Sequence, residues 1–450
     1  MKDHHSSALF TDLYELTMAA AYFENHYAAD ASFELFVRSL PKERGFLLAA
    51  GLEQALEYLE NLQFCEEEIE YLRGQPVFRN VSGAFFQHLA ELRFNGNVWA
   101  MPEGTPVFGE EPLLRVTAPI IQAQIVETSL LSTLTFQTMI ASKAARVVMA
   151  AEGRNVVEFG SRRAHGPQAG MLAARAAYVG GCGGTSNVEA GHRFGVPIFG
   201  TMAHSFVMAY EREEEAFREF QRLFLDASVL LVDTYDTLAA IDKIIRNDLR
   251  PPAVRLDSGD LLSLSKRVRQ KLDQAGLNDT RIFASGDLDE FTIADLLARG
   301  AKIDGFGVGT ALATSKDAPA LGGVYKLVDV QSQRGILYRA KFSEEKATHP
   351  GPKQVFRFSG SDGVYAQDVI ARANEDHADA IALLRPVMRG GKRIEPAVRI
   401  QDIQLRAREE LAKLPLGCRR LREPEPYRVS FSQQLQELSA TVRQQVLNGA

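Results

Sequence analysis

Several residue types that bind phosphate and transfer groups cluster in the middle of the chain. The run EFGSRRAHGP places two adjacent arginines, Arg162 and Arg163, at a turn. Arginine side chains match the planar oxygens of phosphate and carboxylate groups. Residues 141–180 hold 6 Lys or Arg against 2 Asp or Glu, a local excess of +4 in a chain of net charge -6. This segment predicts a pocket for a small anion.

A histidine and two carboxylates supply groups for a reaction at such a pocket. His204 follows an apolar run in GTMAHSF, and imidazole can accept a phosphoryl group reversibly at neutral pH. In VRLDSGD, Arg255 and Asp257 project from the same side of a strand. Carboxylates near phosphate suit Mg²⁺ or ribose hydroxyls. Asp260 instead suits the N-cap of the helix that follows.

Glycine-rich turns follow two further apolar runs, in FASGD (283–287) and GFGVGT (305–310). In a β/α barrel the last such turns form a phosphate cradle from backbone N–H groups. The glycine-rich run YVGGCGGTSNVEAG fits neither the dinucleotide-binding nor the P-loop pattern. Cys182 lies in this run without a basic neighbour that would lower its thiol pKa, so we interpret it as a small buried filler.

The polar residues follow short apolar runs that recur every 20 to 40 residues between about residues 150 and 330. These runs are VVEFG (156–160), VPIFGTMAH (196–204), VLLVDTYD (229–236), AVRLDSGD (253–260), RIFASGD (281–287) and IDGFGVGT (303–310). Such runs are typical of parallel strands buried on both faces, and residues 261–276 and 289–300 show helical periodicity between them. The alternation predicts a β/α barrel, with a doubly wound open sheet as the alternative, and in both the site lies at the carboxyl ends of the strands.

The flanking segments predict a different architecture. Residues 94–119 show short alternating runs broken by Gly and Pro, which is typical of small antiparallel strands, and this pattern returns after Leu327. We therefore predict a barrel over residues 121–329 and a smaller α+β layer built from residues 1–120 and 330–450. Across residues 385–428 there are 12 Lys or Arg against 6 Asp or Glu. This basic stretch is either a solvated face or a site for a phosphorylated ligand or partner.

The composition of the 450 residues excludes several classes of protein. A net charge of -6 speaks against coating of nucleic acid or of an anionic membrane, which reward a basic surface. The 3 cysteines form no CxxC pair, so neither a zinc ribbon nor a disulfide framework is predicted. The N-terminus lacks the pattern of a secretory signal, and no apolar run reaches the length of a membrane span. We expect a soluble, cytoplasmic protein.

Eight motifs, in their order along the chain, resemble nicotinate phosphoribosyltransferases. They are FTDLYELTMAAAY (10–22), EFGSRRAHGP, YVGGCGGTSNVEAGHRFGVPIFGTMAHSFVMAY (178–210), VRLDSGDL, FASGDLDE, GFGVGTALAT, LGGVYKLV (321–328) and KFSEEKATHPGPKQVFR (341–357). The resemblance implies the type II phosphoribosyltransferase fold, a truncated β/α barrel plus an α+β layer, assembled as a homodimer with shared active sites. It implies an enzyme that forms nicotinate mononucleotide and pyrophosphate from nicotinate and phosphoribosyl pyrophosphate. This reaction is coupled to ATP hydrolysis and belongs to the salvage route to NAD.

The resemblance also implies roles for individual residues. The family's phosphohistidine corresponds to His204 in AHSF, and Asp257 and Arg255 complete the catalytic set. Asp257 is also the candidate ligand of Mg²⁺. The implied nicotinate-binding residues are Tyr14 of the partner subunit, Phe159, Arg162, Ser186 and Ser205. The implied phosphate-binding residues are Ser285, Gly286, Gly307, Gly309 and Thr310, with Lys341, Ser343 and Lys353 reaching the pyrophosphate from the other subunit.

The substrate preference and two competing functions depend on a few positions. Relatives that use nicotinamide resemble TDSYK at the N-terminus and place an acidic residue where this chain has Ser186. A carboxylate there would repel the carboxylate of nicotinate, whereas a hydroxyl can donate to it. A quinolinate-using, decarboxylating transferase of related fold is the alternative enzyme, which AHSF and TDLYELT disfavour. A nucleotide-binding sensor without catalysis is the third hypothesis, and the intact set of His204, Asp257 and Arg255 argues against it.

Overall fold

The computed structural model describes residues 8–332, 335–343 and 346–448 and divides the chain into two compact units. One unit joins Met1–Thr138 to Ala320–Ala450, and the other is Met139–Pro319. The sequence predicts a barrel over residues 121–329. The observed first boundary, between Thr138 and Met139, lies instead inside the long helix α6 (Glu127–Ala150). The unit built from both chain ends is the larger one in residue number, whereas the sequence predicts a smaller layer. Residues 1–7, the start of the stretch without a predicted secretory signal, lie outside the described residues.

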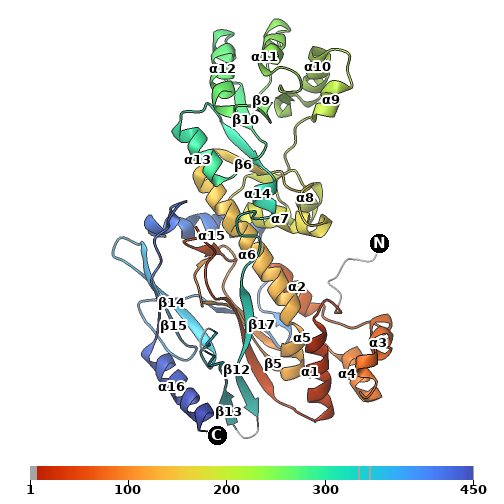
Figure 1. The fold of residues 1–450 in the computed structure, drawn as a ribbon, viewed down its shortest axis with the longest axis vertical. Helices are drawn as coiled ribbons and strands as arrows, with labels where there is room; N and C mark the ends of the chain where they lie inside the picture. Colours follow the sequence, from red (N-terminus) through yellow and green to blue (C-terminus); the bar gives the residue numbers. More distant parts are fainter. Residues whose placement is uncertain (1–7, 333–334, 344–345, 449–450) are drawn as a thin grey trace. The chain divides into compact units, whose positions relative to one another are not determined.

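The unit Met139–Pro319 contains one sheet of six strands, all paired in parallel, in the order β7-β6-β11-β10-β9-β8 (Figure 1). Its strands are β6 (Asn155–Glu158), β7 (Gly184–Thr185), β8 (Val229–Leu231), β9 (Ala253–Leu256), β10 (Arg281–Ala284) and β11 (Gly305–Val308). A closed barrel would follow chain order and return from the last strand to the first. Here that order is interrupted only between β7 and β8, so the sheet is a half-barrel. The predicted truncated β/α barrel is confirmed, and the doubly wound sheet is not found.

Helices connect the strands of the half-barrel. They are α7 (Pro167–Val179), α8 (Val188–Phe194), α9 (His204–Met208), α10 (Glu213–Phe224), η2 (Leu225–Ala227), α11 (Thr237–Arg246), α12 (Leu261–Gln274), α13 (Glu290–Ala298) and α14 (Thr310–Ala313). Three of them begin at an aspartate whose side chain accepts from the first backbone N–H groups: Asp236 for α11, Asp260 for α12 and Asp289 for α13. Such an N-cap accepts hydrogen bonds from backbone N–H groups of the first turn, which have no partner within the helix. The predicted N-cap role of Asp260 and the two predicted helices, now α12 and α13, are confirmed.

The core of this unit lies between its strands and helices. Leu230, Val254 and Ile282 of three neighbouring strands are completely buried, and Ile241 and Val268 of α11 and α12 pack with them. The two helices pack against each other (Figure 1). Truncating one of these strand residues to alanine removes buried methylenes and is expected to cost about 2–5 kcal/mol of stability.

The predicted strand at 196–204 does not form. Only Ile198 makes an isolated parallel bridge, to Thr185. The Thr185 N–H donates to the Pro197 carbonyl at 3.0 Å, and the Phe199 N–H donates to the Thr185 carbonyl at 2.9 Å. Proline has no N–H to continue a ladder. The segment therefore adds two hydrogen bonds beside β7 and then leaves the sheet.

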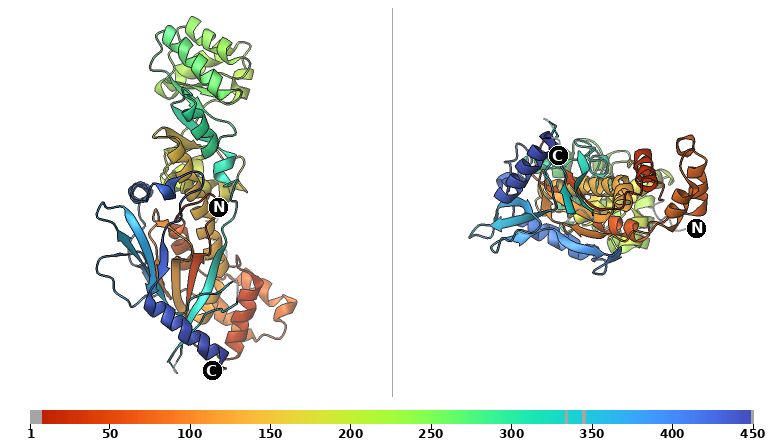
Figure 2. Two further views of the ribbon diagram at one scale, coloured as in Figure 1. Left: turned by 60° about the vertical axis from the view of Figure 1, so that its left-hand side comes forward. Right: turned by 90° about the horizontal axis from the view of Figure 1, so that it is seen from below.

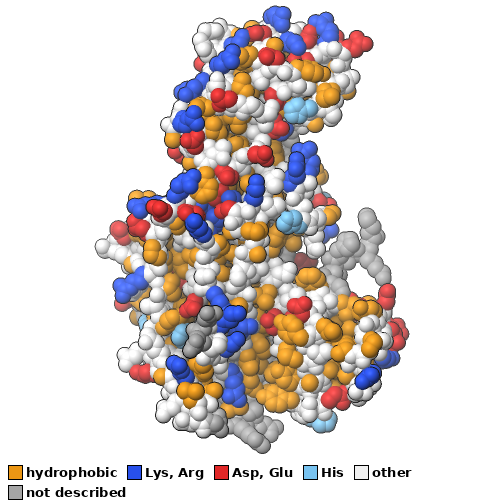
Figure 3. All heavy atoms as spheres, viewed as in Figure 1, with side chains coloured by type: hydrophobic (Ala, Val, Ile, Leu, Met, Phe, Trp, Pro, Cys, Tyr) orange, Lys and Arg blue, Asp and Glu red, His pale blue; other side chains and the backbone are white. Residues whose placement is uncertain are grey.

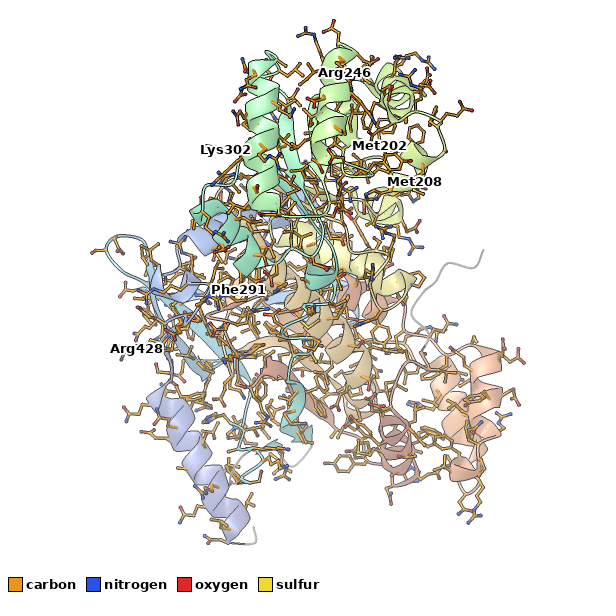
Figure 4. All side chains as sticks on the ribbon, turned by 45° about the horizontal axis from the view of Figure 1, so that its top comes forward. Met202, Met208, Arg246, Phe291, Lys302 and Arg428 are labelled. Atoms are coloured by element: carbon orange, nitrogen blue, oxygen red, sulfur yellow. The ribbon has the colours of Figure 1, made fainter. Side chains whose placement is uncertain are left out.

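His204 consequently begins a helix instead of ending a strand. It is the first residue of α9, and the preceding residues form a loop that leads there from the edge of the half-barrel. Met202, before the helix, is buried, whereas Met208, its last residue, is 63% exposed (both labelled in Figure 4). The strand prediction is wrong here: the run contains a proline and a glycine, and Ile198 and Phe199 are 54% and 44% exposed instead of buried in a sheet.

The other unit is built mainly on antiparallel sheets. Its strands form one sheet in the order β13-β12-β1-β5-β3-β17-β18, a second in the order β16-β14-β15-β19 and a pair β2-β4. The strands are β1 (Asp30–Val37), β2 (Leu47–Leu48), β3 (Asn97–Ala100), β4 (Pro106–Val107), β5 (Pro112–Pro119), β12 (Gly323–Ser332), β13 (Gly335–Tyr338), β14 (Lys353–Ser359), β15 (Tyr365–Arg372), β16 (Ile381–Ala382), β17 (Arg385–Arg389), β18 (Lys392–Arg393) and β19 (Val429–Phe431). The antiparallel strands predicted in 94–119 and after Leu327 are confirmed.

Helices cover these sheets. They are α1 (Leu13–Glu24), α2 (Leu52–Glu60), α3 (Glu66–Arg73), η1 (Pro76–Phe78), α4 (Gly83–Glu91), α5 (Ile120–Ile125), α15 (Ile400–Ala412), η3 (Gly417–Arg419) and α16 (Gln433–Leu447). Helix α1 packs against α5, and α16 packs against β15 (Figure 2). Within the described ranges no helix is both long and apolar enough to cross a membrane.

Candidate active site

Arg255 organises the carboxyl ends of β9 and β10. Its guanidinium donates three hydrogen bonds of 2.7 Å: from Nε to Ser285 Oγ, from Nη1 to Thr201 Oγ1 and from Nη2 to Asp257 Oδ1. Ser285 Oγ in turn donates to the same Asp257 oxygen. The planar fork of arginine fixes three partners at once. The side chains that the sequence placed on one side of β9, Arg255 and Asp257, therefore do meet.

Asp257 is held in its charged form by these contacts. Burial by itself raises the pKa of a carboxyl group. Here the hydrogen bonds from Ser285 and Arg255, together with the arginine's positive charge, outweigh burial and lower the pKa of Asp257 below its ordinary value. The side chain of Asp257 is 28% exposed, against 13% for Arg255. An ionised, accessible carboxylate can accept hydrogen bonds from the hydroxyls of a bound sugar.

Asp233 connects His204 to this cluster. Its Oδ2 accepts hydrogen bonds from the Asp257 N–H at 3.2 Å and from Ser258 Oγ at 2.5 Å. Its Oδ1 is buried without a well-aligned hydrogen bond and lies 3.3 Å from Nε2 of His204. The Asp233 carboxylate is 3% exposed and the histidine side chain 41% exposed. The imidazole is thus oriented from one side by a buried acid and open to ligands on the other.

Phe159 supplies an aromatic surface next to Arg255. Its ring centre lies 5.9 Å from that of Phe283 and 5.5 Å from the Arg255 guanidinium carbon. A Cβ on Gly307 would lie 2.5 Å from Cδ2 of Phe159, so the ring occupies the space that this glycine leaves. Aromatic rings with an adjacent cation are suited to stacking on a flat heterocycle.

Glu158 holds the turns on either side of this aromatic residue. It is completely buried, and its carboxylate accepts hydrogen bonds from the Gly160 N–H and from Thr185 Oγ1, while its carbonyl accepts from the Ser186 N–H. Burial raises the pKa of Glu158, and the hydrogen bonds from Thr185 and Gly160 oppose that rise. The backbone on which Phe159 and Ser186 sit is therefore fixed by one buried acid.

Comparisons with known proteins bear on this cluster of arginine, acids and histidine. Residues 9–135 match the family model of the nicotinate phosphoribosyltransferase N-terminal domain, and residues 376–439 match that of its C-terminal domain. Residues 140–318 match the model of the quinolinate phosphoribosyl transferase C-terminal domain. A nicotinate phosphoribosyltransferase of Mycobacterium tuberculosis is 48% identical over 93% of this chain and 90% of its own length. One of Bacillus subtilis is 39% identical over 95% of this chain and 93% of its own length. The chain belongs to the nicotinate phosphoribosyltransferase family.

Solved structures agree with this membership. The crystal structure of human nicotinic acid phosphoribosyltransferase matches with a TM-score of 0.85 at 30% identity, over 96% of this chain and 99% of that one. The nicotinate-nucleotide pyrophosphorylase of Pyrococcus furiosus matches with a TM-score of 0.74 at 26% identity, over 92% and 97% of the two chains. The predicted family and its type II phosphoribosyltransferase fold are confirmed.

The half-barrel brings together some of the residues that the family resemblance implies. Arg255, Asp257, Ser285 and Phe159 form one contact network, which Asp233 extends to His204. None of the hydrogen bonds described above joins a second set of implied residues to that network. Arg162, Ser186 and Ser205 of this set are exposed, and Gly309 and Thr310 lie at the start of α14. Gly286 has a positive φ of 111°, and a Cβ there would lie 2.6 Å from the Asp257 carbonyl. Its lack of a side chain lets the β10 turn approach the β9 turn.

Gly307 has a structural role beside its predicted phosphate role, which stays a prediction. It lies inside β11, where it pairs with Val157, and not at the strand end. The sequence prediction placed Gly307 and Gly309 of GFGVGT together in a turn that binds phosphate. Gly307 makes room for the ring of Phe159.

Four residues of the predicted site belong to the other unit. Tyr14 on α1 is 46% exposed, and Lys341 and Ser343 are exposed as well. Lys353, in contrast, is 5% exposed. Its Nζ lies 2.8 Å from Glu34 Oε2 and donates to the carbonyls of His349 at 2.8 Å and Gly351 at 2.9 Å. Lys353 is therefore buried and paired with groups of its own unit, and its pyrophosphate role stays a prediction.

Sequence reasoning missed two members of the cluster. Asp233 stands at a strand end in VLLVDTYD, which was its only signal, and received no role. Thr201 precedes the AHSF motif and gave no signal, since its contact to Arg255 depends on how the 196–203 loop folds back.

Two other features of the sequence have structural explanations. Cys182 is completely buried, and burial raises the pKa of its thiol, as expected for a filler and not a nucleophile. In the basic stretch, Arg393 lies 2.5 Å from Glu53 Oε2 and 2.8 Å from Glu60 Oε2, and Arg399 lies 2.8 Å from Asp402. These ion pairs favour the charged-face interpretation. On the half-barrel, acidic and basic side chains are interspersed over α11 and α12 on the face seen in Figure 3.

Proposed function

We propose that this protein is a cytoplasmic, ATP-coupled nicotinate phosphoribosyltransferase of NAD salvage. It forms nicotinate mononucleotide and pyrophosphate from nicotinate and phosphoribosyl pyrophosphate. The observation that carries this proposal is the continuous network from His204 through Asp233 to the Asp257 turn and Arg255. It joins a candidate phosphoryl acceptor to the groups suited to a ribose and a pyridine ring.

The phosphoribosyl transfer follows from the charges of this network. The ring nitrogen of nicotinate attacks the anomeric carbon of the ribose, and the bond to pyrophosphate breaks with its electron pair on the leaving oxygen. Positive charge develops on the ribose in this step, and ionised Asp257 accepts hydrogen bonds from the ribose hydroxyls. Phe159 stacks on the pyridine ring, and Arg162 offers a counter-charge to the substrate's carboxylate. The turns at Ser285, Gly286, Gly309 and Thr310 are suited to the 5′-phosphate.

The donor set around Asp257 fits Mg²⁺ that is bound partly by the substrate. The described residues contain no group of three or more His, Cys, Asp or Glu that could hold a metal. Mg²⁺ commonly takes one or two carboxylates and completes its shell with substrate phosphates and water. Asp257 is charged and accessible, so it can serve as that carboxylate. When bound, Mg²⁺ supplies charge neutralisation of the departing pyrophosphate.

ATP coupling begins at the imidazole of His204. Asp233 Oδ1 lies 3.3 Å from Nε2, and we infer that this carboxylate favours the neutral tautomer with its proton on Nε2 and its lone pair on Nδ1. Nδ1 attacks the γ-phosphorus of ATP, and the bond to the β-phosphate oxygen breaks to release ADP. The added charge lies next to the chain of contacts through Asp233 and the Asp257 turn. Phosphorylation can thereby bias this turn toward tight, productive binding of substrate, and hydrolysis of the phosphohistidine resets it.

The complete site needs a second copy of the chain. Tyr14 is exposed on α1, and Lys341 and Ser343 are exposed next to β13 and β14. In the proposed homodimer, Tyr14 of the partner subunit stacks on the pyridine ring, and the partner subunit's Lys341 and Ser343 reach the pyrophosphate.

A turnover assay tests this function. Purified protein with phosphoribosyl pyrophosphate and Mg²⁺ is given nicotinate, nicotinamide or quinolinate, with and without ATP, and products are separated by chromatography. We expect that, of the three bases, nicotinate alone is used efficiently and is converted to nicotinate mononucleotide. We expect ATP to stimulate this reaction in the wild type and not in His204→Ala. His192→Ala, at an exposed histidine of α8, is the matched control and keeps the stimulation. Carbon dioxide release from quinolinate, or full ATP stimulation in His204→Ala, would contradict the proposal.

A further inference from the structure

Glu15 is a completely buried carboxyl group on α1 that the reaction above does not use. It lies in the first turn of the helix, directly after Tyr14. One carboxylate oxygen accepts from Thr11 Oγ1, and the other accepts from the Thr128 N–H at 3.1 Å and from Thr128 Oγ1 at 2.5 Å. Three donors thus converge on a single buried acid.

These hydrogen bonds join the start of α1 to the start of α6. Thr128 is the second residue of α6, where backbone N–H groups have no partner within the helix. A carboxylate at this place satisfies such a donor and also gains from the helix dipole. Ser129 of the same turn donates to the Phe10 carbonyl at 2.8 Å, and Thr11 Oγ1 also lies 3.2 Å from the Ile125 carbonyl. The segment before α1 is therefore fastened to α6 at several points.

The buried Glu15 determines which way its neighbour faces. Successive residues of a helix lie about 100° apart around its axis, so anchoring one fixes the direction of the next. Tyr14 is 46% exposed while Glu15 is 0% exposed. Burial and the nearby charge of Glu127, the first residue of α6, raise the pKa of the Tyr14 phenol. Helix α6 therefore fixes the turn of α1 that carries this tyrosine, and its first residue lies near the phenol.

We propose that Glu15 is a positioning residue for Tyr14. Its carboxylate clamps the first turn of α1 onto α6 and holds the tyrosine ring ready to stack on the pyridine ring of nicotinate. This inference rests on the proposed function, in which Tyr14 of the partner subunit forms one wall of the base site.

The clamp depends on the charge of Glu15. The titratable and charged groups around it are Asp12 and Tyr14 on α1, Glu127 on α6, Tyr58 on α2, Tyr325 on β12, and Lys326 facing Glu127. Burial raises the pKa of Glu15 to about 7, against the lowering effect of the hydrogen bonds from Thr11 and Thr128. A protonated carboxyl group must itself donate at one oxygen, so it cannot accept all three hydrogen bonds. Below about pH 7 the clamp weakens.

A double-mutant cycle tests whether Glu15 acts through Tyr14. The KM for nicotinate is measured for the wild type, Glu15→Gln, Tyr14→Ala and the double variant. We expect Glu15→Gln to raise the KM about tenfold with a much smaller change in kcat, and the double variant to match Tyr14→Ala. Glu57→Gln, at an exposed position of α2, is the control and leaves the KM unchanged. Effects of the two substitutions that simply multiply in the double variant would overturn the inference.

Hydrogen exchange tests the clamp without any turnover. We expect the amide protection factors of residues 13–18 to fall in Glu15→Gln, and to fall in the wild type as the pH drops below 7. Protection that is unchanged in the variant and independent of pH would overturn the clamp. Failure of the proposed function gives a different result, namely no turnover of nicotinate by the wild type with this exchange pattern intact.

Discussion

Asp233 is the residue on which the orientation of His204 depends most directly. Its Oδ1 faces Nε2 of the histidine, while Oδ2 holds the Asp257 turn. Asp233→Asn keeps an acceptor for the turn but presents an amide N–H₂ to Nε2, which favours the wrong tautomer of the ring. We expect phosphorylation of His204 by labelled ATP to slow by about 100-fold, the range of a misplaced proton-transfer partner. Asp226→Asn, at an exposed position of η2, is the control. Normal labelling of Asp233→Asn would show that Asp233 does not orient the ring.

Gly307 is the residue that leaves room for Phe159. A methyl group there would lie 2.5 Å from the phenylalanine ring and 3.0 Å from Phe283, so the aromatic surface must shift. We predict that Gly307→Ala raises the KM for nicotinate about tenfold, equivalent to about 1.4 kcal/mol of lost binding. Gly83→Ala has no atom within 4 Å of the added Cβ and should leave the KM unchanged. An unchanged KM in Gly307→Ala would mean that Phe159 does not contact the base.

At the scale of elements, one buried acid joins α6 to α13. Glu290, the first residue of α13, lies 2.5 Å from Lys143 Nζ and 3.0 Å from Arg146 Nε, and all three side chains are at most 2% exposed. Removing Glu290 takes a buried negative charge away from Lys143 and Arg146 and leaves Lys143 paired with Asp317 at 2.8 Å. We predict that Glu290→Gln lowers the free energy of unfolding by about 3–5 kcal/mol in a denaturant titration.

The matched control for Glu290 lies on the same helix. Asp295 pairs with Arg299 at 3.1 Å, and both side chains are about 60% exposed. Exposed pairs contribute little, so Asp295→Asn should change the free energy of unfolding by less than about 0.5 kcal/mol. Equal effects of the two substitutions would show that burial does not determine the strength of these contacts.

The segment before β14 makes stability depend on pH. His349 contacts the Phe431 ring at 4.1 Å and Ser439 Oγ at 2.9 Å. Burial, with the nearby charge of Lys353, lowers the pKa of His349 from 6.5 to about 4. The unfolded chain then binds the proton more readily than the folded chain between these values.

The sign of this linkage gives a prediction. The contribution of His349 is complete above about pH 6.5 and is lost as the pH falls toward 4, by roughly 2–3 kcal/mol. His349→Gln cannot titrate, so its free energy of unfolding should fall less steeply over this interval. Parallel pH profiles for the wild type and the variant would contradict the buried, neutral histidine.

The sequence predicted strands best where a short run of apolar side chains marks them. The strands β8 to β11 lie in four of the predicted apolar runs, because each run is short and flanked by a capped helix or a turn. Strand β7 was missed since Gly184 has no side chain to reveal it; a Cβ there would lie 2.3 Å from the Pro197 carbonyl. The 196–204 run was predicted to be a strand from its apolar residues, but Ile198 and Phe199 are 54% and 44% exposed because the chain leaves the sheet there.

The same distinction applies to the site. Arg255 and Asp257 could be paired from the alternation of side chains along one strand, and the family resemblance added His204. The contacts of Thr201 and Asp233 could not be predicted, because they depend on how a loop folds back over two strand ends. Lys353 was assigned to pyrophosphate from its motif, yet its partner Glu34 is more than 300 residues away in the sequence.

At the scale of the whole molecule, the proposed homodimer makes each active site from two chains. Tyr14→Ala and Asp257→Ala should each impair turnover at low nicotinate concentration. Mixing the two variants under conditions that exchange subunits makes half of the dimers mixed, each with one intact site. We predict recovery of about a quarter of wild-type activity. No recovery, despite subunit exchange shown by mass spectrometry, would place the complete site within one chain.

The local distribution of charge informs the function more than the total. The chain is acidic overall, yet the segment 141–180 carries an excess of +4. Lys143 and Arg146 of that segment are bound to Glu290 inside the half-barrel, so they stabilise the fold. Arg162 and Arg163 lie exposed on a loop, and the proposed function assigns Arg162 to the anionic substrate.

The most direct test of the account is ATP-dependent product formation by the wild type and His204→Ala with nicotinate, nicotinamide and quinolinate. The account predicts nicotinate mononucleotide from nicotinate, stimulated by ATP in the wild type and not in the variant. Preference for nicotinamide or quinolinate, or stimulation by ATP that survives the loss of His204, would contradict it.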